Sequence, residues 1–314
     1  MNVSIRLLQE NELAIADHIF RLAFGTFIGL PQPTDFGGDA NYLQPRWQID
    51  PTAAFAAEVN GKLIGSNIAI NWGSVGMFGP LSIHPDFWNQ GIAQSLIQAA
   101  LDQLTQWGIQ QAGLFTFPNS PKHHALYQKF GFYPRCLTFI MAKPIPAAQP
   151  TLPETTKYST LNQQQQADGL KACLQLTDEL YSGLDLSREI VAVQVQNLGD
   201  TLLLWDDAGL AGFAICHCGA SSEAGSGVCY VKFGAVRPGK QAGERFEQLL
   251  DLCEKYGAIQ QMQRLVAGVN TSRDAAYTQM VARQFRTEII GVVMHRPNNP
   301  AYNRPDAFVL DDWR

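Results

Sequence analysis

A cluster of prolines near the middle of the chain is the feature that most limits how this sequence can fold. Four prolines fall between Lys143 and Pro153, in a chain of 314 residues. Such a run cannot lie inside a helix or a central strand, because proline lacks the amide donor and clashes with a preceding helical turn. A chain of this length also fits two domains of about 150 residues better than one core. We therefore predict a domain over residues 1–145, a linker over 146–156 and a second domain over 157–314.

The same patterns recur on both sides of this linker. A proline closing an apolar strand is followed by an aromatic-Gly pair, and later a Phe is followed twelve residues on by a Pro. The first copy has them at Pro85, Trp107-Gly108 and Phe132 to Pro144, and the second at Pro238, Tyr256-Gly257 and Phe285 to Pro297. This repetition predicts a duplicated domain.

The composition is that of a folded protein, with 46% hydrophobic and 16% charged residues. The net charge is −5 and the pI about 5.7, without a basic cluster, so no nucleic-acid partner is expected. No apolar run approaches the roughly 18 residues that cross a bilayer, and the start of the chain has no signal region, so no membrane partner is expected. Six cysteines are few for this length, which favours a cytoplasmic protein with reduced, mostly buried thiols.

Cys216-His217-Cys218 invites comparison with a metal site. It lies in an alternating run typical of a strand, where successive side chains point to opposite faces. His217 therefore cannot join both thiolates in one coordination shell. No metal site is predicted.

The first half has a readable order of elements. An Asn60-Gly61 pair between apolar runs is a strong hairpin signal, and Ser120-Pro121 has the residue types of a helix N-cap and first position. Strands are predicted over residues 5–8, 53–59, 63–71, 77–83, 112–117 and 136–141, and helices over 12–27, 91–107 and 120–131. The result is a mixed sheet flanked by helices.

The segment from Gly79 to Ala93 combines an apolar strand, a proline at its exit and a tight loop into a helix. Gly91 and Ala93 leave the backbone unobstructed at the helix start. The first amides of a helix lack intrahelical partners, and its dipole favours an anion. The pattern predicts a diphosphate site that needs no basic side chain. Alone, such a glycine is weak evidence, because many strand-to-helix turns carry one.

This segment resembles the acetyl-CoA-binding motif of the GNAT (GCN5-related) N-acetyltransferase superfamily. The family's core is Gln or Arg, two variable residues, Gly, one residue, then Gly or Ala; Gly91 and Ala93 match it. Trp88 stands where Gln or Arg is usual, which implies that one side-chain contact to phosphate is weakened while the backbone contacts remain.

The resemblance implies an α/β (α+β) fold with two GNAT-like domains, each a mixed, mostly antiparallel sheet flanked by helices. It implies acetyl-CoA as the cofactor, with its pantetheine arm entering a splay between the strands at 77–83 and 112–117. The residues implied to bind the cofactor are Leu81, Ser82, Ile83, Trp88, Asn89, Gln90, Gly91, Ile92, Ala93 and Asn119.

A second match lies downstream, from Asn119 to Phe132, and resembles the later motif of the same family. There an Asn ends a strand and a helix carries Leu-Tyr, then Gly-Phe. The family's tyrosine falls on Tyr127, and its implied role is the general acid that protonates the departing coenzyme A thiolate. Without the motif, Tyr127 would be interpreted as a packing residue beside Phe130.

The general base has no motif to fix it. Glu58 has the parity of a surface strand residue, and His84 is interpreted as polar lining or structural. His123 lies one turn before Tyr127 on the same helix face, although a solvated position at the helix start is favoured. Weak candidates for the acceptor pocket are Asp35, Asn71 and Trp72.

The second half resembles the same family without its active parts. It is four residues shorter where the first copy carries the phosphate loop, and the tyrosine position falls on Met280; Tyr277 could substitute only in a shifted register. We interpret it as a degenerate copy that packs on the first half and helps to wall the acceptor site. The alternative is two active sites in tandem.

The leading hypothesis is an N-acetyltransferase that moves acetyl from acetyl-CoA to a primary amine by direct attack. The acceptor is a small molecule or a peptide, and the acidic net charge weakly favours a small cationic amine. A homodimer is left open. The alternatives are a non-catalytic sensor that binds coenzyme A or an acyl-CoA, and a structural dimerisation protein.

Overall fold

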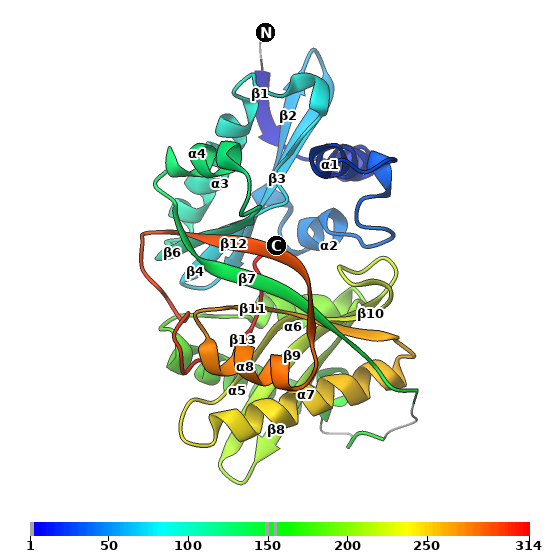
Figure 1. Cartoon of the computed structure of the whole chain (residues 1–314), viewed down its shortest axis with the longest axis vertical. Helices are drawn as coiled ribbons and strands as arrows, with labels where there is room; N and C mark the ends of the chain where they lie inside the picture. The colour runs from blue at the N-terminus through cyan, green and yellow to red at the C-terminus, as the bar shows by residue number, and fades with distance from the viewer. Residues whose placement is uncertain (1–2, 148–150, 154–155) are drawn as a thin grey trace.

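The structure is a computed structural model that describes residues 3–147, 151–153 and 156–314. Part of the predicted linker, residues 148–150 and 154–155, therefore lies outside the described residues. The two halves of the chain are stacked end to end, with strands crossing the middle between them (Figure 1).

The first half follows the predicted order closely. Its elements are β1 (Val3–Leu7), α1 (Leu13–Ile28), α2 (Leu43–Ile49), β2 (Ala54–Val59), β3 (Lys62–Trp72), β4 (Val75–Phe78), β5 (Ser82–Ile83), α3 (Ile92–Gln106), β6 (Gln111–Thr116), α4 (Pro121–Gln128) and β7 (Tyr133–Pro144). The predicted caps form as expected: the Ser120 side chain accepts from the amide of His123 at 3.4 Å, and Gly108 adopts φ +71° just after α3.

The second half repeats this order without β1. Its elements are α5 (Gln163–Leu180), α6 (Ser187–Val195), β8 (Gly199–Asp206), β9 (Gly209–Gly219), β10 (Gly225–Val236), α7 (Ala242–Ile259), β11 (Arg264–Asn270), α8 (Asp274–Ala282), β12 (Arg286–Arg296) and the added β13 (Val309–Leu310). A single antiparallel bridge from Lys157 to Leu202 stands where β1 pairs with β2 in the first half. The tandem arrangement indicated by the sequence repeat is therefore present in the topology.

The predicted fold class, a mixed sheet flanked by helices, is confirmed, but the two sheets are joined into one. The strand order is β1-β2-β3-β4-β6-β12-β7-β11-β10-β9-β8, with β5 on β3 and β13 on β10. The closing strand of each half thus completes the sheet of the other: β12 pairs with β6, and β7 pairs with β11. The two exchanged strands pair with each other across the centre, where they run side by side (Figure 1).

Several boundaries differ from the sequence prediction, and two of the differences bear on the site and on how the halves are joined. The strand expected over 77–83 is split into β4 and β5, because the chain breaks at Gly79-Pro80 and the Gly79 carbonyl accepts from Arg46 Nη1 at 3.1 Å. The last strand of the first half is longer than predicted: β7 reaches Pro144, opposite Arg264. Its extension follows from pairing with β11 of the other half, which local sequence does not encode. The division into domains at residues 145 and 157 remains our proposal.

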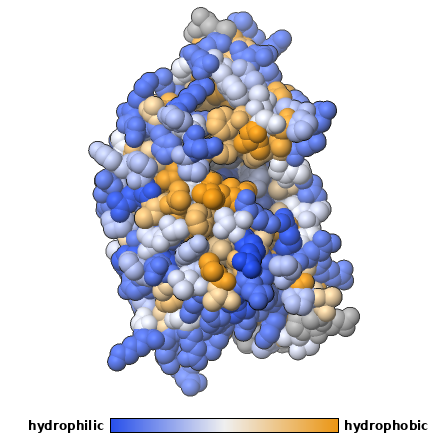
Figure 2. Space-filling view, viewed as in Figure 1, coloured by the Kyte–Doolittle hydropathy of each residue, from blue (hydrophilic) through white to orange (hydrophobic). Residues whose placement is uncertain are grey.

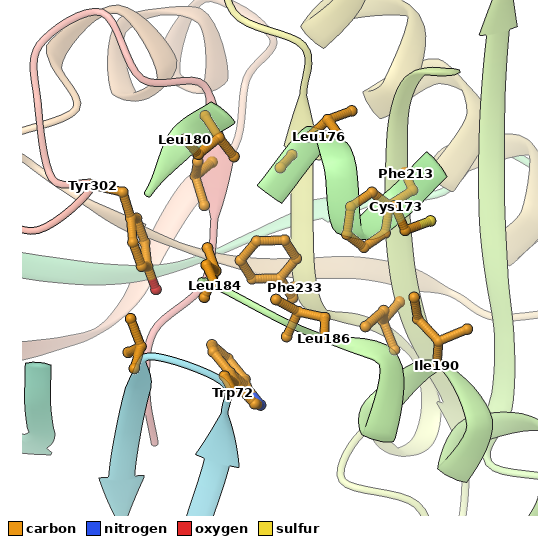
Figure 3. Packing of buried hydrophobic residues seen from close by; sticks show 14 of the residues in the cluster. Trp72, Cys173, Leu176, Leu180, Leu184, Leu186, Ile190, Phe213, Phe233 and Tyr302 are labelled. Atoms are coloured by element: carbon orange, nitrogen blue, oxygen red, sulfur yellow. The ribbon is translucent and has the colours of Figure 1, made fainter. Parts of the chain in front are cut away.

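The largest apolar cluster joins the two halves. Trp72 at the end of β3 contacts Phe233 of β10 edge to face, with ring centroids 5.6 Å apart. Leucines of α5 and of the α5–α6 turn surround this pair, together with Phe213 (Figure 3). Truncating a buried aromatic side chain of this kind costs about 3–5 kcal/mol, so the cluster is a major source of stability for the joined fold.

Beside this cluster lies a buried network of four charges. Arg46 of α2 donates to both carboxylate oxygens of Glu223, at 3.0 and 2.7 Å. Lys232 of β10 lies 2.7 Å from Glu223 and 3.0 Å from Glu189 of α6, which also accepts from Trp72 Nε1. The charges balance, and Arg46 and Lys232 lower the pKa of Glu223 although burial raises it. The network fixes α2 of the first half against the second half.

We expect Glu223→Gln to destabilise the protein by about 3 kcal/mol or more, because it leaves two buried cations without their shared anion. Urea unfolding measures the change. The matched control is Asp306→Asn, which removes the carboxylate of an exposed pair with Arg304 and is expected to change the stability by less than about 0.5 kcal/mol. Equal effects of the two substitutions would contradict the role assigned to the network.

Candidate active site

A cavity of about 860 Å³ lies between the two halves. Its walls come from α1, the β4–β5 segment, the loop before α3, the end of β6, α4, β12 and the last residues of the chain. A hollow crosses the middle of the molecular surface, with apolar residues on both sides of it (Figure 2). Both copies of the repeat therefore contribute to one site.

The inner part of this cavity is the predicted gap between strands. β4 and β6 pair in parallel from Val75 opposite Gln111 to Met77 opposite Gly113, and no further. After the break at Gly79-Pro80, β5 pairs with β3 instead. Within the described part of the chain the backbone amide and carbonyl of Leu81 have no hydrogen-bond partner. The gap therefore presents an open strand edge to the cavity, suited to an added extended ligand.

The loop at the start of α3 presents free amides to the same cavity. Gly91 is the N-cap residue, with φ +82°, a conformation that glycine adopts without strain. Within the described residues, the amides of Gly91, Ile92 and Ala93 have no backbone partner, whereas Gln94 donates to the Gly91 carbonyl at 3.0 Å. These groups lie at the positive end of a 15-residue helix. The arrangement matches the requirement for binding a diphosphate through backbone groups.

Trp88 stabilises the conformation of this loop. Its indole Nε1 donates to the carbonyl of Ile83 at 2.7 Å and thereby closes the turn between β5 and α3. The Nζ of Lys122 lies 5.5 Å from the centre of the indole ring. Lys122 of α4 and Lys129, the residue after α4, also line the cavity. At position 88 the loop lacks the basic or amide side chain of the family motif. The ammonium group of Lys122, from α4, lies beside this position.

Sequence reasoning missed these two lysines. They follow the Ser-Pro start of α4 and carry no motif of their own. The proximity of Lys122 to the loop depends on where the tertiary fold places α4 relative to Trp88. A search for cations that compensate for Trp88 would have been the one available signal.

Tyr127 lies in the cavity wall and is 7% exposed. Its hydroxyl lies near the side chain of Thr116, at the end of β6, and its ring lies 6.2 Å from that of Phe78. Burial raises the pKa of Tyr127 well above its usual value, more than the Thr116 hydroxyl lowers it. The phenol therefore stays protonated throughout the physiological pH range.

His123 also reaches the cavity, one turn before Tyr127. Its ring centre lies 4.7 Å from that of Phe27 on α1. Its buried Nδ1 has no hydrogen-bond partner in the described structure. Burial, followed by the charge of Lys122, lowers the pKa of His123, so the imidazole is neutral at pH 7. The favoured interpretation as a solvated helix-start residue is therefore wrong.

Asn119 does not join the other predicted residues. β6 ends at Thr116, and the turn that follows leaves Asn119 exposed and outside the cavity wall. The assignment to cofactor binding therefore has no geometric support here. The other predicted cofactor residues, Leu81, Ser82, Ile83, Trp88, Asn89, Gln90, Gly91, Ile92 and Ala93, all line the cavity.

The weaker candidates lie elsewhere. Glu58 pairs with Arg6 at 2.7 Å on the surface, and His84 accepts from the amide of Asp86 as the cap of a short turn. Asp35 and Asn71 are outside the cavity wall, and Trp72 is buried between the halves. These residues are therefore not brought together with Tyr127.

The corresponding gap in the second half is filled by the chain itself. β10 and β11 pair in parallel only as far as Val231 opposite Ala267. Beyond that point β13 pairs with β10, Leu310 opposite Gly234 and Val309 opposite Ala235. A Cβ on Gly268 of β11 would lie 2.3 Å from the Cβ of Asp312, which shows how closely the segment after β13 approaches that strand. A ligand strand like the one expected in the first half has no room there.

The segment that fills this gap then enters the wall of the first site. Trp313 packs on Gly113 of β6 and stacks on His295, with ring centres 5.0 Å apart. Its indole nitrogen donates to the hydroxyl of Tyr302 at 2.8 Å. Trp313 and Arg314 both line the cavity. Met280, at the position that matches Tyr127, is fully buried among apolar residues.

Comparison with known proteins agrees with this geometry. Residues 22–132 match the model of the Acetyltransferase (GNAT) family. This part of the chain therefore matches a GNAT acetyltransferase domain, and members of that family use acetyl-CoA as the donor. A search of curated protein sequences finds no match.

Two solved structures share the fold over nearly the whole chain. A candidate acetyltransferase from Pyrococcus horikoshii matches with a TM-score of 0.69 and 12% identity, over 99% of this chain and 95% of that one. A GCN5-related N-acetyltransferase from Sphaerobacter thermophilus matches with a TM-score of 0.58 and 16% identity, over 94% of this chain and 95% of that one. At these identities the likeness is one of fold.

Two negative findings complete the description. Within the described residues no group of three or more His, Cys, Asp or Glu side chains is arranged to hold a metal ion. None of the helices in the same part of the chain is long and apolar enough to cross a membrane.

We expect Lys122→Gln to weaken coenzyme A binding up to about fivefold at low salt, because it removes a partly screened cation beside the phosphate loop. The loss should shrink as salt is added. Isothermal calorimetry at two ionic strengths measures both effects. Lys62→Gln, on the exposed β2–β3 hairpin, is the control and should bind like the parent protein. A loss that does not respond to salt would contradict an electrostatic role.

Proposed function

We propose that this protein is an acetyltransferase that moves the acetyl group of acetyl-CoA to a primary amine. One observation carries the proposal: the open strand edge at Leu81, the free amides at Gly91 and the phenol of Tyr127 face a single cavity. The first fits a pantetheine arm, the second a diphosphate and the third a leaving thiolate. If Tyr127 were only a packing residue, there would be no reason for it to share a cavity with the open strand edge at Leu81 and the free amides at Gly91.

The cavity fits the donor in two further respects. Gly91 has open space around it, with Nε2 of Gln94 at 3.8 Å as the nearest neighbour to a Cβ, so phosphate can approach the backbone. Lys122, beside Trp88, adds positive charge at the same end. The Ile83 carbonyl already accepts from Trp88, which leaves Leu81 as the backbone group best placed to pair with the pantetheine amides.

Acetyl-CoA supplies a thioester whose carbonyl carbon an amine can attack directly. The C–N bond forms as the C–S bond breaks, and the amine must lose a proton while the thiolate gains one. Nucleophilic catalysis through the protein would need a thiol or hydroxyl with a paired base, and Cys136 is the one cysteine that is exposed. Cys136 does not line the cavity. Direct attack is therefore the route that these residues favour.

Tyr127 is assigned as the proton donor to the thiolate. Its burial keeps the phenol neutral, and the same apolar surroundings disfavour a free thiolate beside it. The hydroxyl of Tyr127 carries one proton, which it can donate to the sulfur of a thioester in the cavity. Its contribution is a hydrogen bond that strengthens as negative charge develops on sulfur.

His123 is assigned as the acceptor of the amine proton. Among the described residues that line the cavity, His123 is the one imidazole and Glu288 the one side-chain carboxylate, and Glu288 pairs with Arg264. The lowered pKa of His123 keeps it in the basic form. Its place in the cavity wall, on the same helix face as Tyr127, supports this role.

One site per chain follows from the second half. β13 and the residues after it occupy the gap that would receive a second donor, and Met280 replaces the tyrosine. We propose that the second copy is degenerate as a catalyst and serves as the wall of the first site. A coenzyme A sensor without catalysis is the alternative, and turnover distinguishes the two.

We expect Gly91→Trp to abolish acetyl-CoA binding, because an indole at this open position would fill the space before the free amides and strain a backbone with φ +82°. Calorimetry with acetyl-CoA measures the loss. Gly61→Trp is the matched control: Gly61 has φ +74°, also lies in open space, and belongs to a hairpin outside the cavity wall. Binding by the Gly91 variant equal to that of the control would exclude this loop as the phosphate site.

We expect Tyr127→Phe to lower kcat by about 10²-fold with little change in the affinity for acetyl-CoA. The acid form is the active one, and its raised pKa keeps it populated, so kcat of the parent protein should show no falling limb up to about pH 10. Thiol release at saturating amine, followed from pH 6 to 10, gives the profile. Unchanged turnover in the phenylalanine variant would remove Tyr127 from the mechanism.

A further inference from the structure

One wall of the outer cavity is aromatic. Phe24 and Phe27 of α1 face Phe36 and Phe117, with ring centres 5.2 Å apart for Phe24–Phe36 and 4.8 Å for Phe27–Phe117. All four line the cavity. Phe27 packs against other aromatic rings, and 37% of its surface is still exposed. The end of this wall is His123, whose ring lies against Phe27.

The opposite wall is aliphatic and comes from the second half. Ile289 and Ile290 of β12 are 46% and 47% exposed, and both line the cavity. Consecutive strand residues normally point to opposite faces, but a register shift against β7 between Thr287 and Ile289 disturbs the alternation here. Trp313 continues this wall inward. Both walls of the outer cavity are therefore apolar.

The charges of the cavity wall do not suit a polycation. Among the described lining residues Glu288 is the one carboxylate, and it is paired with Arg264. The cations Arg46 and Arg314 are themselves held by Glu223 and Asp312. A substrate with several ammonium groups would lose its hydration here without gaining partners. The net charge of the whole chain weakly favoured a small cationic acceptor. The side chains that line the site argue against an acceptor with several positive charges.

We propose that the acceptor is a primary amine carried by an apolar body, an aromatic ring or an alkyl chain, that lies between the aromatic wall of α1 and the β12 wall. The proposal rests on the proposed function and assigns the substrate class of the same site. Burial of the apolar body removes Phe27, Ile289 and Ile290 from water, and the amino group points inward to His123 and Tyr127. The exchanged strand β12 thus makes the second half a determinant of acceptor specificity.

The test compares amines of matched reactivity and different bodies. The full-length protein is supplied with saturating acetyl-CoA, and thiol release is measured with 2-phenylethylamine, hexylamine, ethanolamine and spermidine. We expect kcat/KM for the first two to exceed that for ethanolamine at least about tenfold, since several apolar carbons enter an apolar site. Spermidine at or above the level of 2-phenylethylamine would overturn the proposal.

A pair of variants locates the effect. Ile290→Ser should lower kcat/KM for 2-phenylethylamine about fivefold through KM, with the KM for acetyl-CoA unchanged. Ile259→Ser is the control, because Ile259 is also partly exposed, at 38%, but lies on α7 outside the cavity wall. Equal kinetics of the two variants with 2-phenylethylamine would contradict the assignment of the β12 wall.

Direct binding separates this proposal from the proposed function. Saturation-transfer NMR with 2-phenylethylamine and with spermidine reports occupancy of the cavity without any turnover. If acetyl-CoA binds and only ethanolamine or spermidine is acetylated, the substrate class is wrong while the proposed function stands. If acetyl-CoA does not bind and 2-phenylethylamine still does, weakened by Ile290→Ser, the apolar site stands and the proposed function is wrong.

Discussion

The antiparallel pairing of β7 with β12 is the interaction on which the rest of the molecule depends. Each of these strands closes the sheet of the other half, so neither copy completes its own sheet from its own residues. The exchange brings the buried charges of Arg46, Glu223, Lys232 and Glu189 together and encloses the Trp72 cluster. Because burial of one half requires the strand of the other, we infer that the two halves unfold as one cooperative unit.

The second half contributes directly to the cavity of the first. β12 supplies one wall of the cavity, and the segment beyond β13 carries Trp313 and Arg314 into it. That segment first fills the gap of the second half, where a donor would otherwise lie. One stretch of chain thereby occupies the second gap and furnishes part of the first site. The two copies differ in structure because the gap of the first is open and that of the second is filled by the protein's own backbone.

The phosphate loop shows how a departure from a family pattern is accommodated. Trp88 replaces the usual side-chain contact to phosphate, yet its indole nitrogen holds the Ile83 carbonyl and shapes the turn. The helix amides remain free, and Lys122 brings a cation from α4 to the same end of the cavity. The backbone contacts predicted from Gly91 and Ala93 therefore have the geometry they need, whereas the compensating charge could not be located from the loop alone.

The sequence by itself determined the features that short segments encode. The elements of the first half follow from helical periodicity, the Asn60-Gly61 hairpin, the Ser120 cap and Gly91 before α3. Tyr127 follows from the family motif that runs from Asn119 to Phe132. Only the tertiary structure decided the exchange of β7 and β12, the position of Asn119 outside the cavity, and the apolar walls at Phe27 and Ile290. The physical reason is that turns, caps and periodicity act between near neighbours in the chain. Strand pairing between residues more than a hundred positions apart depends on which surfaces are left to bury once those local elements have formed.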